Sequence, residues 1–206
     1  MNDDEAFSLT IEHRTPHRRT TDHTRDDWRT PPDLYDNLCR RFTFTGDACA
    51  SDQNHLAERY FTAEDDALSS NWSKLGQFVF MNPPYSEVSR FISRARRAVE
   101  DGEVRCVVSL VPSTPDVSWF HKDALTSASE LWFMRGRISF IDPVSLSPVP
   151  GNPVGSCVIV WSEGGGGWAG PRVGSLCSKT FMPLGSHDIA YWDSMMRGRK
   201  KQMDLF

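Results

Sequence analysis

Four consecutive residues, Asn82-Pro83-Pro84-Tyr85, carry the clearest chemical signal in this chain. They follow the apolar run 78–81, and a strand over that run must end at two prolines, which lack a backbone donor. The rigid turn can place the Asn82 amide, the Pro83 carbonyl and the Tyr85 ring in one cleft at the carboxyl end of a sheet. Two acceptors suit both protons of a planar amino group, and an aromatic ring can stack on the heterocycle. The turn therefore predicts a site for an exocyclic amino group, and the plainer alternative is a stiff loop beside a core strand.

Helices and strands are expected to alternate on both sides of this turn. A first helix should begin at Pro31 and Pro32 with Thr30 as its cap. The helix expected over 86–101 has an apolar inward stripe and four largely outward arginines: Arg90, Arg94, Arg96 and Arg97. Strands are predicted at 42–48, 78–81, 104–111, 130–134, 138–141 and 156–161, with another helix at 116–125 and a proline-rich loop at 142–153. This order predicts an α/β doubly wound sheet, mostly parallel with an antiparallel end.

Size and composition limit how the chain is organised. With 206 residues and 39% hydrophobic content, it can build one sizeable core. We expect a single domain over 28–162, preceded by a disordered polar arm over 1–27 and followed by a glycine-rich linker and tail over 163–206. No stretch fits a membrane span or a signal peptide, so a cytoplasmic protein is expected. Five scattered cysteines predict no metal site, and the net charge of −4 still allows a local basic face for DNA.

Other stretches accompany the turn: Trp28-Arg29-Thr30-Pro31, Gly46-Asp47-Ala48-Cys49-Ala50, Glu64-Asp65-Asp66-Ala67-Leu68 and Arg135-Gly136-Arg137-Ile138-Ser139-Phe140. In this order, over about residues 28–162, the chain resembles the phage-type DNA N-6-adenine methyltransferases, which are small Dam-like enzymes. The resemblance implies a Rossmann-like methyltransferase sheet and a site-specific enzyme of the bacterial host's cytoplasm. That enzyme would methylate the exocyclic amino group of adenine in DNA, using S-adenosylmethionine. Asn82, Pro83, Pro84 and Tyr85 would hold the target base after it has been flipped out of the duplex.

The same resemblance implies three groups of cofactor-binding residues. The first would contact the methionine end of S-adenosylmethionine, the second would supply an acid for its α-amino group, and the third would line its adenine ring. In chain order they are Trp28, Thr30 and Pro31, then Asp47 and Ala48, then Asp66 and Leu68.

Two of these assignments have local rivals. Asp47 could instead cap the following turn, and Asp65 is placed as well as Asp66 to reach the cofactor. The glycine-rich loop that commonly follows the first strand is replaced by residues 47–52, and only 35 residues separate Asp47 from Asn82. The cofactor half is therefore expected to be abbreviated, with Asp52 a candidate for the ribose hydroxyls.

Other functional classes remain open from the sequence. One is an amino-group methyltransferase that acts on RNA or on a protein glutamine, because such enzymes use the same turn. Another is a catalytically inactive module that binds DNA or the cofactor. Carbon-5 cytosine chemistry is not expected, because none of the five cysteines follows a proline.

Two further segments suggest contacts with partners. Arg135 and Arg137 flank Gly136 and are candidates for contacts with DNA phosphates. The C-terminal Gln202-Met203-Asp204-Leu205-Phe206 resembles the pentapeptide by which bacterial DNA-processing proteins dock on the sliding clamp. Gln202 would anchor this peptide, while Leu205 and Phe206 would fill an apolar pocket. The expected partners are therefore DNA and the clamp, with the chain acting as a monomer.

Overall fold

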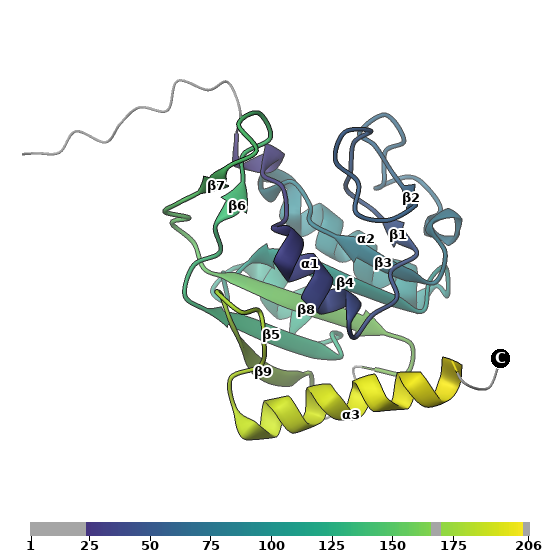
Figure 1. The fold of residues 1–206 in the computed structure, drawn as a ribbon. Coiled ribbons are helices and arrows are strands. Elements are labelled where there is room, and N and C mark those ends of the chain that lie inside the picture. The colour runs from purple at the N-terminus through teal and green to yellow at the C-terminus, as the bar shows by residue number, and fades with distance from the viewer. Residues whose placement is uncertain (1–23, 166–169, 204–206) are drawn as a thin grey trace, which may run out of the picture.

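One seven-stranded sheet organises the computed structural model, which describes residues 24–165 and 170–203 (Figure 1). Its strand order is β2-β1-β3-β4-β8-β5-β9, and a separate two-stranded hairpin pairs β6 with β7. The strands are β1 Gly46–Asp47, β2 Arg59–Tyr60, β3 Phe78–Met81, β4 Cys106–Pro112, β5 Glu130–Arg135, β6 Phe140–Ile141, β7 Pro148–Val149, β8 Ser156–Ser162 and β9 Arg172–Cys177. The helices are α1 Pro32–Cys39, α2 Val88–Glu100 and α3 Ser186–Met203, with shorter turns η1 Arg25–Asp27, η2 Trp72–Leu75, η3 Tyr85–Glu87 and η4 Phe120–Ala124.

The sheet is mostly parallel. β1 pairs in parallel with both β2 and β3, β3 pairs in parallel with β4, and β5 does so with β9. β8 runs antiparallel to both of its neighbours, β4 and β5. The predicted Rossmann-like α/β sheet is thus confirmed, and its antiparallel strand lies inside the sheet between β4 and β5.

Both faces of the sheet are covered, because the central strands alternate their side chains between two apolar layers. Along β4, Val107 and Val111 pack into the layer formed with α2, whereas Val108 and Leu110 pack into the layer formed with α1. Figure 1 shows α1 in front of the sheet and α2 behind it. Burial on both faces explains why β4 reads as an apolar run interrupted only by Ser109.

The C-terminal part differs from the linker and tail expected over 163–206. β9 adds a parallel strand next to β5, and α3 packs against the sheet through the buried Trp192 (Figure 1). The sequence pattern hid β9 because Gly174 interrupts it, and glycine weakens an isolated strand. The structure requires glycine there, since a Cβ atom would lie 2.5 Å from the Trp132 ring.

A buried ion pair sits where α3 meets the sheet. The Arg41 guanidinium binds both carboxylate oxygens of Glu130, which also accept hydrogen bonds from Trp132 Nε1 (2.7 Å) and Tyr191 Oη (3.0 Å). Both charges are almost fully buried. The Glu130 carboxylate thus gains two ring donors besides Arg41, one of them from α3, whereas Arg41 Nε is buried without a partner in the described chain.

Several local expectations also need correction. Part of the segment assigned to the disordered arm is ordered: Arg25–Asp27 form η1, and Thr24 and Asp27 form its capping box. The strand expected at 42–48 is only β1, the helix expected at 116–125 is only the short η4, and the strand at 138–141 is only β6. Part of the expected loop at 142–153 forms β7. These segments are short because tertiary contacts, and not local periodicity, set their conformation.

Two side-chain expectations were also wrong. Thr30 does not cap α1, because Pro31 occupies the cap position and no side chain caps the helix. Arg94 does not face solvent, because its guanidinium pairs with Glu103 (2.6 Å) and lies 5.1 Å from the Trp72 ring centroid. Within the described residues, no helix combines the length and apolar character needed to cross a bilayer.

Candidate active site

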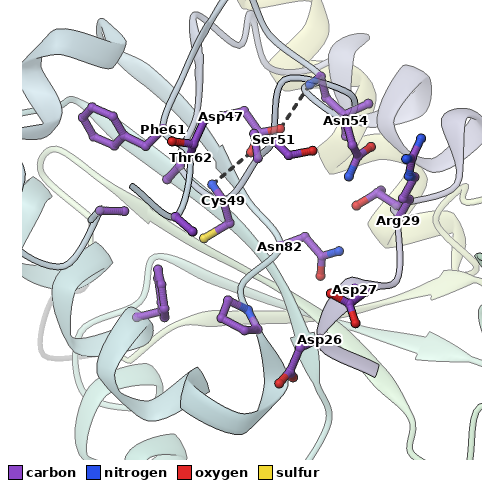
Figure 2. Close-up of a pocket in the computed structure, with 18 of the residues that line it drawn as sticks. Asp26, Asp27, Arg29, Asp47, Cys49, Ser51, Asn54, Phe61, Thr62 and Asn82 are labelled. Atoms are coloured by element: carbon purple, nitrogen blue, oxygen red, sulfur yellow. Dashed lines mark hydrogen bonds between the residues drawn. The ribbon is translucent and has the colours of Figure 1, made fainter. Parts of the chain in front are cut away.

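A pocket of about 730 Å³ opens beside the carboxyl ends of β1 and β3. Five segments distant in sequence form it: the stretch before α1, the loop after β1, residues 61–68, the end of β3 with the turn leading into α2, and Pro143 after β6. Its size falls in the range of small-molecule sites. Figure 2 shows the side chains of Asn82, Asp47 and Arg29 arranged around it.

Asn82 has a fixed amide orientation in this pocket. Its Nδ2 donates a hydrogen bond of 3.3 Å to the backbone carbonyl of Trp28, which can only accept. The nitrogen must therefore face Trp28, which turns Oδ1 away from that carbonyl. Oδ1 is buried and has no hydrogen-bond partner within the described chain. A buried acceptor without a partner is costly, so this atom is poised to receive a donor from a ligand.

The segment carrying Trp28 is held in place by the β6–β7 hairpin. Arg29 exchanges two backbone hydrogen bonds with Ile141 (2.9 and 3.0 Å), and the Trp28 ring stacks on Phe140 at 5.8 Å. On its other side, Asp26 Oδ1 accepts a hydrogen bond of 2.9 Å from the backbone of Ser86. The carbonyl that orients Asn82 is thereby tied to the same turn that carries Asn82.

Asp47 lies at the end of β1 and is buried. Its Oδ1 accepts from the backbone N–H of Cys49 (3.2 Å), and its Oδ2 accepts from that of Leu56 (3.1 Å). Burial raises the pKa of Asp47 to about 6, and these two hydrogen bonds offset part of the increase. The carboxylate thus shapes the loop after β1, as the capping alternative expected, and it also lines the pocket.

The loop after β1 takes the place of a glycine-rich loop. Ser51 and Asn54 close it with reciprocal backbone hydrogen bonds of 3.1 and 2.9 Å. Ala48 lines the pocket, whereas Asp52 does not and accepts instead from the Tyr60 hydroxyl (3.0 Å). Asp52 therefore has a local partner away from the pocket lining.

Asp66 and Asp65 differ in where they lie. Asp66 lines the pocket together with Leu68, and its carboxylate accepts from the Leu68 backbone (3.2 Å) and the Ser69 hydroxyl (2.8 Å). Asp65 is outside the pocket lining, and Thr62 donates to it from both its backbone and its hydroxyl. The Thr62 backbone hydrogen bond is the main reason that the pKa of Asp65 is lowered. The structure thus brings Asp66, and not its rival, to the pocket.

The structure therefore brings only some of the predicted site residues together in the pocket. Trp28, Thr30, Asp47, Ala48, Asp66, Leu68, Asn82 and Pro84 line the pocket. Pro31, Pro83 and Tyr85 do not. The Tyr85 ring meets Phe140 edge-on at 6.1 Å, its hydroxyl is buried, and burial is the main cause that raises its pKa.

The predicted partner residues lie elsewhere. Arg135 ends β5 and Arg137 follows it, and both are exposed and away from the pocket. Gln202 falls within the helical backbone of α3. Leu205 and Phe206 lie outside the described residues.

Sequence reasoning missed several pocket residues. Arg29 links the stretch before α1 to the loop after β1, because its guanidinium donates to the backbone carbonyl of Gln53 (3.3 Å). Its place between Trp28 and Thr30 was a signal that could have found it. Other missed residues, among them Asp26, Phe61 and Glu87, come from segments whose approach to the pocket had no local sequence signal.

The fold is a Rossmann-like α/β fold of the methyltransferase kind, and the pocket lies at the carboxyl edge of its sheet. A family model described as DNA N-6-adenine-methyltransferase (Dam) matches residues 17–179. The chain therefore belongs to the DNA N-6-adenine-methyltransferase (Dam) family, which makes it a member of a class of DNA-modifying enzymes.

Curated relatives agree with this assignment. The chain is 28% identical over 159 residues to the DNA N-6-adenine-methyltransferase of Escherichia phage T1, with 70% of the chain and 66% of the relative covered. It is 28% identical over 121 residues to the enzyme of the same name from Haemophilus phage HP1, and this alignment covers 57% of the chain and 68% of the relative. The putative methyltransferase YfdM of Escherichia coli K12 is 37% identical over 65 residues, with 29% and 71% covered. The aligned regions thus span about two thirds of these relatives' lengths.

Proposed function

We propose that this chain transfers the methyl group of S-adenosylmethionine to the exocyclic amino group of adenine in DNA. The target base would be flipped out of the duplex and held at the Asn82 turn. The observation that carries the proposal is the Asn82 amide, whose nitrogen is occupied by Trp28 and whose buried oxygen has no partner in the described chain. An amino group is the complementary donor for that oxygen.

Asn82 would act by orienting the nucleophile. With the Asn82 oxygen accepting one proton of the amino group and the Pro83 carbonyl accepting the other, the nitrogen lone pair would be directed outward and freed from conjugation with the ring. As methyl transfer places positive charge on that nitrogen, the Asn82 oxygen and the nearby pocket carboxylates Asp26 and Asp27 would stabilise it (Figure 2). No general base within the protein is needed before this step, because the amino nitrogen attacks as a neutral group.

The other pocket residues fit the cofactor. When bound, S-adenosylmethionine supplies an electrophilic methyl group on a sulfonium. Asp47 presents a buried carboxylate with a raised pKa, for which an ammonium group is the natural partner. Asp66 and Leu68 offer an acceptor and an apolar surface for an adenine ring, and Trp28 and Thr30 line the pocket from the segment that continues into Pro31 and would contact the methionine end. Ala48 follows Asp47 on the same wall.

Pro83, Pro84 and Tyr85 would complete the base site. The prolines hold the turn that follows β3, and the Tyr85 ring would stack on the flipped adenine. Arg135 and Arg137 remain candidates for contacts with phosphates, since both are exposed and carry no ion pair within the described residues. The reaction would take place in the bacterial cytoplasm.

The deciding experiment is transfer of labelled methyl groups to DNA, RNA and protein pools, followed by nucleoside analysis. We expect label in DNA as N6-methyladenine, with none above background for Asn82→Ala. Label confined to RNA or to protein glutamine would overturn the proposal in favour of another substrate. Cofactor binding without any transfer would identify an inactive binding module.

We also propose that the last five residues recruit a bacterial sliding clamp. The motivation is the peptide Gln202-Met203-Asp204-Leu205-Phe206, whose Gln202, Leu205 and Phe206 match the docking pattern. Since Gln202 lies in α3, binding would require the last turn of this helix to unwind. A synthetic 199–206 peptide should bind the clamp with a micromolar Kd, and deleting 202–206 should leave turnover on short duplexes unchanged. No peptide binding at high micromolar concentration would refute recruitment.

A further inference from the structure

A second hollow of about 610 Å³ runs along the outer side of α2. We name it the α2 groove. It is lined by Leu68, by Ser89, Arg90, Ser93 and Arg97 of α2, and by Ser118, Trp119, Lys122 and Asp123 of the segment around η4. Leu68 and Arg90 line the first pocket as well, so the two hollows are adjacent.

The groove is positively charged although the chain carries a net charge of −4. Arg97 and Lys122 are exposed, and neither forms an ion pair in the described part of the chain. The Asp123 carboxylate is buried and neutralised by Arg96 Nε at 3.0 Å. Arg90 is paired with Glu87. The groove charge that no ion pair takes up is therefore that of Arg97, which also acts electrostatically on Glu103, and that of Lys122.

The remaining lining supplies hydrogen-bond donors and a ring. Ser89 and Ser118 are exposed, so their hydroxyls are available to a ligand. Trp119 is half-buried and packs at 5.4 Å on the buried Phe120, which fixes its ring at the groove wall. Cations, hydroxyls and an aromatic surface along one channel are the groups that bind a sugar–phosphate backbone and its bases.

We infer that the α2 groove binds the DNA backbone next to the flipped adenine. This inference rests on the proposed function, since it takes the neighbouring pocket as the base site. A nucleotide in that pocket must continue into phosphates on either side, and the groove shares two residues with the pocket at the side of α2. The charge of the groove matches that polyanion, whereas the surface of the chain as a whole is acidic.

The test compares two charge-matched double variants. Arg97→Gln with Lys122→Gln removes both uncompensated charges from the groove. Lys74→Gln with Arg105→Gln removes one lysine and one arginine that are exposed and line neither hollow. Anisotropy of a labelled duplex, measured over a range of salt concentrations, reports the DNA Kd of each protein.

We expect the groove variant to bind DNA roughly tenfold or more weakly at low salt, and its slope of log affinity against log salt to fall by about 2. KM for DNA should rise, while kcat at saturating DNA and the Kd for S-adenosylmethionine stay unchanged. Arg97→Lys with Lys122→Arg, which keeps both charges, should retain most of the affinity. Thermal melting checks that each variant is folded.

The outcomes separate this inference from the proposed function. Suppose that the wild type is active and that the groove variant has the same DNA Kd and salt slope as the control variant. This result would refute DNA binding by the α2 groove and would leave the proposed activity intact. If the wild type binds DNA through Arg97 and Lys122 but transfers no methyl group, the proposed activity is refuted and DNA binding by the α2 groove still stands. As a second variant, Ser118→Asp places a negative charge in the groove and should also weaken DNA binding; unchanged binding would count against the inference.

Discussion

The side-chain amide of Asn82 is held by the backbone carbonyl of Trp28, 54 residues earlier in the chain, through a hydrogen bond of 3.3 Å. This contact decides which end of the amide is free. A carbonyl can only accept, so it must face the Asn82 nitrogen, and the Asn82 oxygen is left without a partner in the described chain. The stretch before α1 thereby acts on the turn after β3 through the Trp28 carbonyl, and also through the Asp26 carboxylate, which accepts from the Ser86 backbone.

Replacing Asn82 by alanine should abolish methyl transfer while changing the Kd for S-adenosylmethionine by no more than a few fold. The variant loses an interaction made at the target nitrogen, which should lower kcat by about 10²–10³. Radiometric transfer assays and titration calorimetry measure the two effects separately. Turnover at the wild-type rate would refute the assignment of this turn as the base site.

Substitutions at Tyr85 should separate its ring from its hydroxyl. Tyr85→Phe should keep most activity, since it retains the ring face that would stack on the base and loses only the buried hydroxyl. Tyr85→Ala should lose most activity, and it should also lower the free energy of unfolding by about 2 kcal/mol, because the contact with Phe140 is lost. Steady-state kinetics and urea unfolding provide both readouts. Equal loss of activity in the two variants would argue against stacking.

The pH dependence of stability should carry a contribution from Asp47. Its pKa is raised by burial from 3.8 to about 6, so the folded state holds this proton more tightly than the unfolded state does. The contribution of Asp47 to stability is therefore greatest below pH 3.8. It is lost as pH rises from 3.8 to about 6, the pKa of Asp47 in the folded state. Relative to Asp47→Asn, the wild type should lose about 3 kcal/mol of unfolding free energy across this window. Urea unfolding of both proteins on either side of the window checks the sign.

Cofactor binding should show the opposite dependence on pH. The ionised form of Asp47 is the one that accepts from an ammonium group, so the affinity for S-adenosylmethionine should rise as pH increases through about 6. Asp47→Asn should bind about tenfold or more weakly, which corresponds to about 1.5–3 kcal/mol for a charge-assisted hydrogen bond. Calorimetry over a pH series measures both effects. Unchanged affinity in a less stable variant would leave Asp47 with its loop-shaping role alone.

Trp192 tests whether α3 belongs to the folded domain. It is 1% exposed and meets Trp132 edge-on at 5.0 Å, with the Arg41 guanidinium 4.8 Å from its ring. Trp192→Ala should destabilise the protein by about 3–5 kcal/mol, whereas Trp192→Phe, which keeps a ring in the cavity, should cost much less. Calorimetric melting distinguishes them. A wild-type melting temperature for Trp192→Ala would show that α3 is dispensable for the fold.

Local chemistry made part of this protein readable from its sequence. Two prolines after an apolar run end a strand wherever the chain folds, so the turn at 82–85 and its place at the edge of the sheet were predictable. The apolar runs that became β4, β5 and β8 were predictable for the same reason, because burial on both faces leaves a continuous apolar pattern.

Long-range packing decided the rest. β9 forms because β5 offers it a partner and Gly174 leaves room for the Trp132 ring, although its own pattern is weak. Arg94 turns inward because Glu103 and Trp72 receive it there. The orientation of the Asn82 amide depends on the position of the Trp28 carbonyl. The Tyr85 ring packs against Phe140 and lies outside the pocket lining. Sequence patterns record the preferences of single segments, whereas these positions depend on contacts between segments that meet only in the folded chain.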